Sequence, residues 1–383
     1  PWHLETLEGD PASLSTFNAD TGKTPAAAAF NGQLYVLSYE ATGGNLRLAK
    51  TTPTWHFSTL DGTGGTNGRK NADVGRTPSL LAAGNTLHSF YYDATGGNLR
   101  HGLTGDGAAW RFEDLDGTAG SILGRNRNLG QTPAAVVMPD GTIHVAYRDA
   151  EQGNLLLATA LPGQPWTSTV LEGDPNSVSG KDGDIGHDPA LVSYQGNLHS
   201  LHYNKTGGNL RHAWKTGSTW RFEDLDGTSG SICGKDANLG KHPTALVHNG
   251  TLQVFAHDEG NKDLRHYWSD QNGWHCETLE GDANAVLGEG ETGGEVGAMP
   301  TAISLGAISL HIFAKETKYG SLRHYWTDTT GWHAENFDGL GGNPAGRTNH
   351  STGDDPAVTA FGTTPQLFWY DNTLGDLRHS IPD

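Results

Sequence analysis

Trp220-Arg-Phe-Glu-Asp-Leu-Asp-Gly227 is repeated almost letter for letter at 110–117 and in weaker form five more times. Placing the aromatic starts in register divides the chain into seven units of about fifty residues each. The units begin at Trp2, Trp55, Trp110, Trp166, Trp220, Trp274 and Trp332. Repeats of this period indicate one array of equivalent structural units. We therefore expect residues 1–383 to form a single domain.

Each unit contains four short segments typical of β-strands, separated by Gly, Asn, Asp and Pro clusters that favour turns. In the fourth and fifth units these segments are 189–193, 197–203, 209–214 and 219–225. Four antiparallel strands repeated seven times predict an all-β, seven-bladed β-propeller. If the strand after each recurring Pro is innermost, residues 2–7 form the outer strand of the last blade, beside 377–380. The N-terminal strand then closes the last blade.

The net charge of −18 argues against a nucleic-acid ligand, because phosphate binding needs clustered Lys and Arg. No apolar run approaches the roughly twenty residues that a membrane-spanning helix needs. Acceptor triplets for N-glycosylation at Asn204, Asn249 and Asn349, and a first repeat that begins at Trp2 as in a trimmed mature product, favour secretion to the extracellular space. We expect a monomer that binds neither nucleic acid nor membrane.

The two cysteines occupy places that apolar residues hold in other repeats. Cys233 stands where the third repeat has Leu123, and Cys276 stands where others have Phe112 and Phe222. A buried thiol behaves as a small hydrophobe, so we expect two free structural cysteines, with a disulfide as the alternative. Neither has metal-ligand spacing, and no cofactor is expected. A structural calcium ion in the central tunnel is left open.

Function in a propeller collects where loops meet the axis, and the recurring Gly-X-X-Pro turn leads into each expected inner strand. Its first X is Lys23, Arg76, Gln131, His187, Lys241, Ala298 and Asp354. Its second X is Thr24, Thr77, Thr132, Asp188, His242, Met299 and Asp355. A recurring turn with divergent occupants favours one asymmetric central pocket.

The second strand of each blade returns to the same end, which we name the mouth. We call equivalent positions in the seven aligned repeats a column. The last two columns of this strand are Ser38, Tyr91, Tyr147, His202, Ala256, Ala314 and Trp369, followed by Tyr39, Tyr92, Arg148, Tyr203, His257, Lys315 and Tyr370. Arg148, His257 and Lys315 depart from Tyr, and such departures are where function overrides the repeat. An acidic protein thus gathers cations at one mouth, which predicts an anionic ligand such as a uronic acid carboxylate. The alternative is a rim of solvated side chains.

Other columns repeat too regularly to mark one site. Arg47, Arg100, Arg211, Arg265, Arg323 and Arg378 form a column broken only by Leu156, and we interpret them as packing or ion-pair residues. The column of His88 contains four histidines and is interpreted as structural, although His88 could be recruited. No nucleophile elbow, phosphate loop or His-Glu-x-x-His site occurs, and no carboxylate pair stands out.

The repeated aromatic and Arg positions resemble those of propeller lectins from fungi and bacteria, including fucose binders. The central His, Tyr and Arg residues are instead similar to those of propeller-type polysaccharide lyases, in particular the secreted fungal L-rhamnose-α-1,4-D-glucuronate lyases that trim arabinogalactan and gum arabic. This resemblance implies β-elimination at a 4-linked uronate and release of terminal rhamnose. A non-catalytic, multivalent lectin for fucose or rhamnose is the alternative.

The lyase resemblance assigns three roles. Arg76 and Arg148 would hold the carboxylate, His88 or His202 would remove the C5 proton, and Tyr147 or Tyr203 would protonate the leaving oxygen. The remaining candidates would bind sugar hydroxyls or a second charge: Lys23, Gln131, His187, Lys241, His242, His257 and Lys315.

Overall fold

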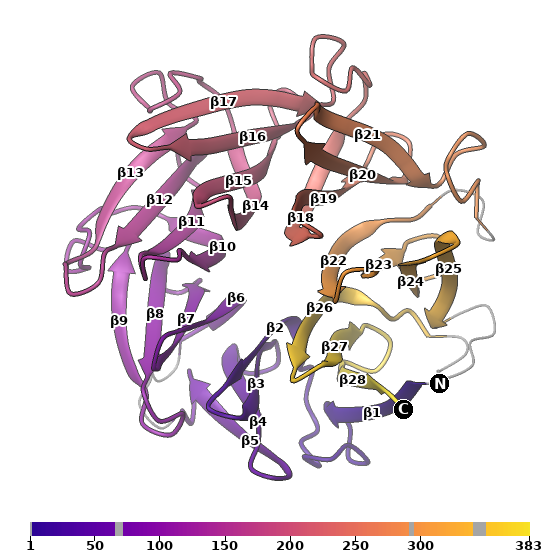
Figure 1. The fold of residues 1–383 in the computed structure, drawn as a ribbon. Helices are drawn as coiled ribbons and strands as arrows, with labels where there is room; N and C mark the ends of the chain where they lie inside the picture. The colour runs from indigo at the N-terminus through magenta and orange to yellow at the C-terminus, as the bar shows by residue number, and fades with distance from the viewer. Residues whose placement is uncertain (1, 66–71, 291–294, 340–349) are drawn as a thin grey trace.

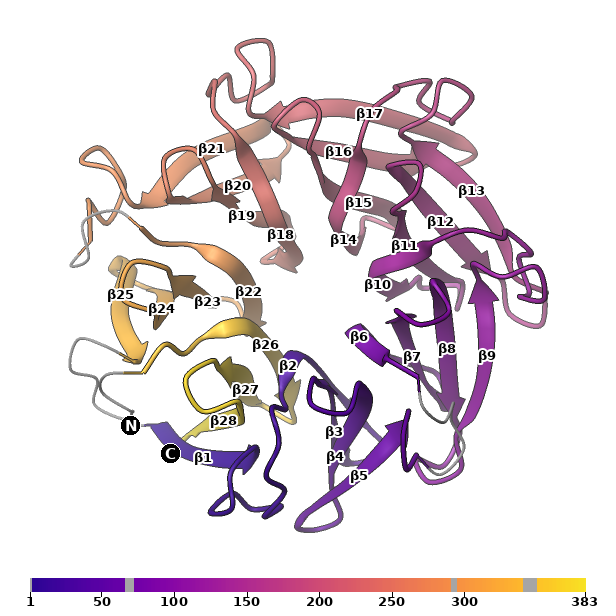
Figure 2. The same ribbon diagram turned by 180° about the vertical axis from the view of Figure 1, so that it is seen from behind.

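The computed structural model describes residues 2–65, 72–290, 295–339 and 350–383. Within these ranges the regular structure is entirely β-strand, in seven four-stranded antiparallel sheets set around a central axis (Figures 1 and 2). The predicted seven-bladed β-propeller is confirmed. No helix in the described part of the chain is long and apolar enough to cross a membrane.

The blades are numbered in chain order, each from its inner to its outer strand. Blades 1 to 3 are β2 (Lys23–Phe30), β3 (Gln33–Glu40), β4 (Asn45–Thr51), β5 (Trp55–Asp61); β6 (Val74–Ala83), β7 (Thr86–Asp93), β8 (Asn98–Thr104), β9 (Arg111–Asp116); and β10 (Leu129–Val137), β11 (Ile143–Asp149), β12 (Asn154–Ala160), β13 (Thr167–Glu172). Blades 4 and 5 are β14 (Ile185–Tyr194), β15 (Asn197–Asn204), β16 (Asn209–Thr216), β17 (Thr219–Asp226); and β18 (Leu239–His248), β19 (Thr251–Asp258), β20 (Asp263–Asp270), β21 (Gly273–Glu280). Blades 6 and 7 are β22 (Ala298–Leu305), β23 (Ser309–Glu316), β24 (Ser321–Asp328), β25 (Gly331–Asp338); and β26 (Asp354–Phe361), β27 (Thr364–Asp371), β28 (Asp376–Pro382), β1 (Trp2–Glu8).

The ring closes as predicted, with both ends of the chain in blade 7. Strand β1 pairs antiparallel with β28, so that Leu4 lies opposite Ser380 and Glu8 opposite Leu377. The inner strands contact one another around the axis, β2 against β26 included. The two termini therefore lie side by side (Figure 1).

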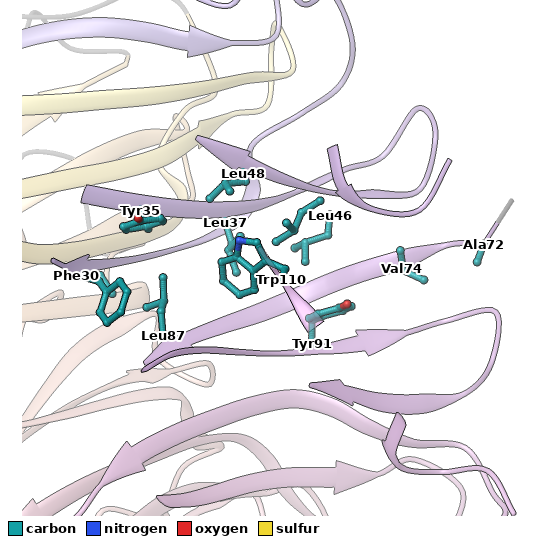
Figure 3. Close-up of a cluster of buried hydrophobic side chains, with 12 residues drawn as sticks. Phe30, Tyr35, Leu37, Leu46, Leu48, Ala72, Val74, Leu87, Tyr91 and Trp110 are labelled. Carbon is teal, nitrogen blue, oxygen red and sulfur yellow. The ribbon is translucent and has the colours of Figure 1, made fainter. Parts of the chain in front are cut away.

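The hydrophobic core lies between the blades. In one cluster Leu37 and Leu46 of blade 1 meet Val74 and Tyr91 of blade 2, with the indole of Trp110 packed among them (Figure 3). Trp110 is only 5% exposed. An aromatic side chain of this size removes about 200 Å² from water, worth about 5 kcal/mol. The recurring Trp therefore serves packing between neighbouring blades.

The X-X-Pro part of the turn lies inside the first strand rather than before it, which corrects the predicted strand start. In blade 4 the strand begins at Ile185, four residues before Pro189, and its register shifts around His187. The second X has a positive φ in every blade, including β-branched Thr24 (47°), Thr77 (47°) and Thr132 (44°). Such residues rarely adopt this conformation. The turn is therefore a β-bulge held by its surroundings.

Buried ion pairs join neighbouring blades, as interpreted for the Arg column. The outer strand of one blade ends in a fully buried carboxylate, and an Arg on the third strand of the next blade reaches it. Examples are Arg100 with Asp61 (2.9 Å) and Arg265 with Asp226 (2.7 Å). Removing one partner of such a pair leaves an uncompensated charge in the interior. These Arg residues are thus structural.

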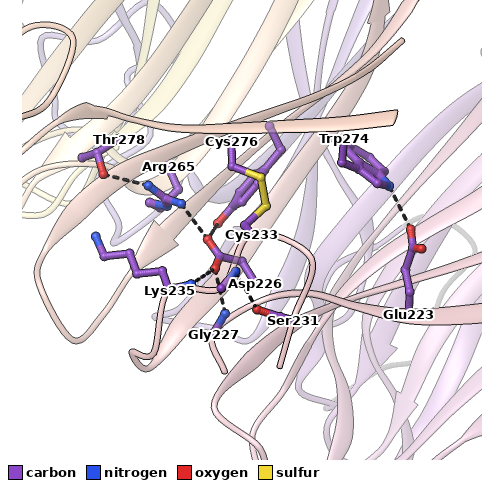
Figure 4. The surroundings of a disulfide bond; sticks show 12 residues. Glu223, Asp226, Gly227, Ser231, Cys233, Lys235, Arg265, Trp274, Cys276 and Thr278 are labelled. Carbon is purple, nitrogen blue, oxygen red and sulfur yellow. Dashed lines mark hydrogen bonds and ion pairs between the residues drawn. A yellow bond between two sulfur atoms is a disulfide. The ribbon is translucent and has the colours of Figure 1, made fainter. Parts of the chain in front are cut away.

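A disulfide joins Cys233 to Cys276, so the expectation of two free thiols was wrong. Cys233 lies in the loop after β17 and Cys276 lies on β21, with Cα atoms 6.0 Å apart (Figure 4). The bond crosses from blade 4 to blade 5 beside the Asp226 and Arg265 ion pair. Repeat register places both cysteines at apolar positions, but it does not show that these two positions face each other.

Candidate functional site

The two predicted mouth columns meet as cross-strand neighbours at one end of the ring. The pairs are Lys23 with Tyr39, Arg76 with Tyr92, Gln131 with Arg148, His187 with Tyr203, Lys241 with His257, Ala298 with Lys315 and Asp354 with Tyr370. Most of the sequence-predicted site residues therefore do share one face of the protein.

The basic side chains of the mouth contact carboxylates of the protein itself. Arg148 lies 2.6 Å from Asp184, and Lys315 lies 2.5 Å from Asp354. The other contacts are Lys23 to Asp20 (2.7 Å), Arg76 to Asp73 (3.2 Å), Lys241 to Glu259 (3.5 Å), His242 to Asp188 (3.5 Å) and His257 to Glu259 (3.4 Å). Positive and negative side chains therefore alternate at the mouth. An anionic ligand cannot be inferred from an excess of positive charge there.

Sequence reasoning missed three of the acidic partners, although they share one place in the repeat, two residues before the Gly of the turn. The three are Asp20, Asp73 and Asp184, and Asn128 and Asn238 take the place of the acid at two boundaries. Each accepts a hydrogen bond from the preceding blade, as Asp73 does from Tyr39 (2.9 Å). The contact crosses a blade boundary, so local strand periodicity does not reveal it.

One groove at the mouth collects several of the predicted residues. It lies between blades 4 and 5, has a volume of about 780 Å³, and extends from Asp188 and His242 near the axis outward to Gly227 and Asp236. Its walls include His187, Tyr203, Lys205, Asn238 and Lys241. This volume suits a ligand of a few sugar units.

His187 is held in one orientation on the groove wall. Its Nε2 lies 2.9 Å from Asp184, which also accepts a hydrogen bond from Arg148 over 2.6 Å. Burial, and then the charge of Arg148, lower the pKa of His187 below its usual value of 6.5. Burial opposes ionisation of Asp184, but the hydrogen bonds of Arg148 and His187 keep its pKa low. Near neutral pH, His187 is therefore neutral, with the proton on Nε2 and the lone pair on Nδ1.

Tyr203 and Lys241 complete the groove beside His187. The rings of His187 and Tyr203 are 6.1 Å apart between centroids, and Nζ of Lys241 lies 6.0 Å from the Tyr203 ring. The Tyr203 hydroxyl donates to Asn238 over 2.5 Å. Burial, and then the charge of Glu259, raise the pKa of Tyr203, so it stays protonated.

Lys241 is less neutralised than its counterparts in other blades. Lys23 pairs with Asp20 at 2.7 Å, whereas the equivalent acceptor beside Lys241 is the uncharged Asn238. The carboxylate that Lys241 does contact, Glu259, is 3.5 Å away and is shared with Lys262. Lys241 is thus placed to accept an external carboxylate in the groove.

Three predicted catalytic residues lie away from the mouth. Tyr147 and His202 have no exposed surface and bond the buried carboxylates of Asp116 (2.8 Å) and Glu172 (2.7 Å). Neighbouring side chains of a strand point to opposite faces, so these two face the preceding blade while Arg148 and Tyr203 face the next. His88 lies near the start of β7, four residues or roughly 13 Å from its mouth end. None of the three can touch a ligand in the groove.

The remaining candidates lie outside the groove. Gln131 accepts a hydrogen bond from Arg148 (3.1 Å), and Lys23 and Arg76 lie at other blade boundaries. His257 is 4% exposed, and burial lowers its pKa to about 4.

The second X residues and their prolines line an open axial pocket of about 240 Å³. The pocket includes Asp188, His242 and Asp355. Within the described ranges, no three His, Cys, Asp or Glu side chains are grouped to hold a metal ion.

The repeated Arg and His columns cannot form one sugar site per blade. Arg211 and Arg323 are 5% and 3% exposed and are paired with carboxylates. His212 and His266 are also buried and bond Glu223 and Glu277, both at 2.7 Å. The repeated residues that suggested a multivalent lectin are therefore buried in the protein's own contacts, the Arg residues between blades and the His residues within them.

No protein-family model matches the chain, and no curated protein matches its sequence. Among solved structures, the polysaccharide lyase Uly1 superposes with a TM-score of 0.55 at 12% identity, over 96% of this chain and 91% of that one. The Hadza microbial sialidase Hz136 superposes with a TM-score of 0.50 at 13% identity, over 90% and 72%. A Trypanosoma rangeli sialidase does so with a TM-score of 0.50 at 13% identity, over 93% and 59%. At these identities the likeness concerns the fold, which carbohydrate-processing enzymes also use.

Proposed function

We propose that this propeller is a polysaccharide lyase that binds an acidic saccharide in the groove between blades 4 and 5 and cleaves it by β-elimination. The observation that carries the proposal is the meeting of His187, Tyr203 and Lys241 in one groove. They are a neutral imidazole, a protonated phenol and a weakly paired cation. These are the base, the acid and the carboxylate partner that elimination needs.

The reaction assigns one task to each side chain. Lys241 binds the uronate carboxylate and stabilises the charge that develops as the C5 proton leaves. Nδ1 of His187 takes that proton, the electron pair forms the C4–C5 double bond, and the C4–O4 bond breaks. The Tyr203 hydroxyl then protonates the departing O4. Asp184 and Arg148 act as positioning residues, because they fix the His187 ring without lining the groove themselves.

The sequence resemblance suggests the first substrate to try. A rhamnosyl-α-1,4-glucuronate end, as in arabinogalactan and gum arabic, presents a 4-linked uronate and a neutral leaving sugar. The disulfide between Cys233 and Cys276 supports secretion, since such bonds persist in oxidising compartments. The glycosylation triplets lend less support: Asn204 is buried, only Asn249 is exposed, and Asn349 lies outside the described residues.

The test follows free rhamnose and the ultraviolet absorbance of a new unsaturated uronate during incubation with gum arabic. Both should rise together, and His187→Ala and Tyr203→Phe should each lower the rate by about 10²- to 10⁴-fold. Tyr370→Phe is the matched control, because Tyr370 holds the equivalent position in blade 7 and bonds Asp20 (2.7 Å). Release of rhamnose without the chromophore would show hydrolysis instead of elimination. Binding without either product, at one site per chain, would show a lectin.

A further inference from the structure

A second cavity opens on the face opposite the mouth, between blades 3 and 4. Its volume is about 410 Å³. One wall is the 138–142 hairpin that joins β10 to β11, and the opposite wall holds Asn197 and Lys215 of blade 4. We name it the far-face cavity. It contains none of the residues assigned to the mouth.

Lys215 is unlike the cations of the mouth. Within the described ranges its ammonium group has no hydrogen-bond or ion-pair partner, although the protein carries a net charge of −18. Lys215 lies opposite Trp220 on the outer strand, and the equivalent residues opposite Trp55, Trp274 and Trp332 are Thr51, Ser269 and Thr327. Among these four blades, only blade 4 has a charged residue at this position, and the other three have a small residue with a hydroxyl group.

The neighbouring side chains also depart from the repeat. His144 bonds Thr159 (2.9 Å), whereas the equivalent His199 bonds a second histidine, His212 (2.9 Å). His144 and Lys215 line the same cavity, and burial, and then the charge of Lys215, lower the pKa of His144 to about 4. Asp140, at the rim, accepts a hydrogen bond from the Thr142 amide (2.9 Å).

We propose that the far-face cavity binds one carboxylated sugar unit, with the carboxylate on Lys215. The hydroxyls face Thr142, His144 and Asn197, and the apolar face of the ring lies against Met138 and Leu161. The ammonium group of Lys215 is the reason to expect that the ligand carries a negative charge. The choice of a uronate rests on the proposed function, because an acidic polysaccharide long enough to reach both faces would be held at two places.

The experiment measures D-glucuronate binding by calorimetry to Lys241→Met protein, in which the mouth groove has lost the cation assigned to the carboxylate. We expect one site per chain. Adding Lys215→Met should weaken it at least about tenfold, because a charge-assisted hydrogen bond is lost. Lys50→Met is the control, since Lys50 is a lysine at the end of β4 that donates to the carbonyl of Gly107 (3.1 Å), and it should change nothing.

Three results would overturn the inference. Binding that survives Lys215→Met excludes this lysine, and glucose binding as tightly as glucuronate removes the need for an anion. Sulfate binding as tightly as glucuronate reduces the cavity to a simple anion site. A wild-type protein without lyase activity that still shows the Lys215-dependent site would refute the proposed function and support this inference.

Discussion

Arg125 lies 2.8 Å from a fully buried oxygen of Asp116, and this ion pair replaces the one that Leu156 cannot make. At the other blade boundaries of the described chain, the cation comes from the third strand of the next blade, as with Arg211 and Glu172. Here it comes from the loop after β9. The same interior charge is thus neutralised from a different point of the sequence.

Arg125→Ala should therefore lower the free energy of unfolding by about 3 kcal/mol, because Asp116 is left buried without a cation. Adding Leu156→Arg restores the cation in the geometry of the other blades and should recover more than half of the loss. Urea unfolding measures both. A Leu156→Arg substitution that recovers nothing would show that Arg125 acts through something other than the charge of Asp116.

The disulfide should contribute about 4 kcal/mol, since it closes a loop of 43 residues in the unfolded chain. Cys233→Ala with Cys276→Ala should lower the unfolding temperature and leave the proposed lyase activity intact. The pair Cys233→Leu with Cys276→Ser copies Leu123 and Ser168, which occupy the equivalent positions at the boundary of blades 2 and 3. It should lose less stability than the alanine pair. Equal losses would mean that packing at this boundary is unimportant.

Stability should fall as the pH is lowered from about 6.5 towards 4. Burial lowers the pKa of His88 and His311 to about 4 and that of His199 to about 3. The unfolded chain therefore binds more protons in this range, and each group adds a slope of up to about 1.4 kcal/mol per pH unit. Unfolding by urea at several pH values measures the slope.

His88→Gln is the control for that slope, since Gln253 already occupies the same column and bonds His266 (2.7 Å). This variant should fold and show a flatter dependence on pH. An unchanged slope would assign the acid sensitivity to other groups.

Arg148→Met should move the acid limb of the pH-rate profile to higher pH. The charge of Arg148 helps to lower the pKa of His187, and its loss lets that pKa rise. The proposed base, His187, is active only when neutral, so the proposed activity then fails at a higher pH. A lower rate with an unshifted profile would mean that Arg148 has only a structural role.

The repeat predicted the architecture because its information is local. Period and turn residues define four strands per unit, and the start at Trp2 predicts how the ring closes. The strand starts were misplaced because the bulge at Gly-X-X-Pro continues the strand where sequence suggests a turn, as at Ile185.

The site was predicted only in part, because its contacts cross blade boundaries. Column alignment identified His187, Tyr203 and Lys241 as mouth residues. The alignment could not show that Asp184 fixes His187. It also included His202, which is next to Tyr203 in the sequence but points to the opposite face of the sheet.

The pairing of β1 with β28 also has a consequence for folding during synthesis on the ribosome. The hydrogen bond between Glu5 and His379 (2.8 Å) spans 374 residues, so β1 is made long before its partner. At ordinary translation speeds, which are about 5 to 20 residues per second, that wait is roughly 20 to 75 seconds. During it β1 has no partner and the nascent ring has an unpaired edge. A chain that ends before β28 leaves β1 permanently unpaired.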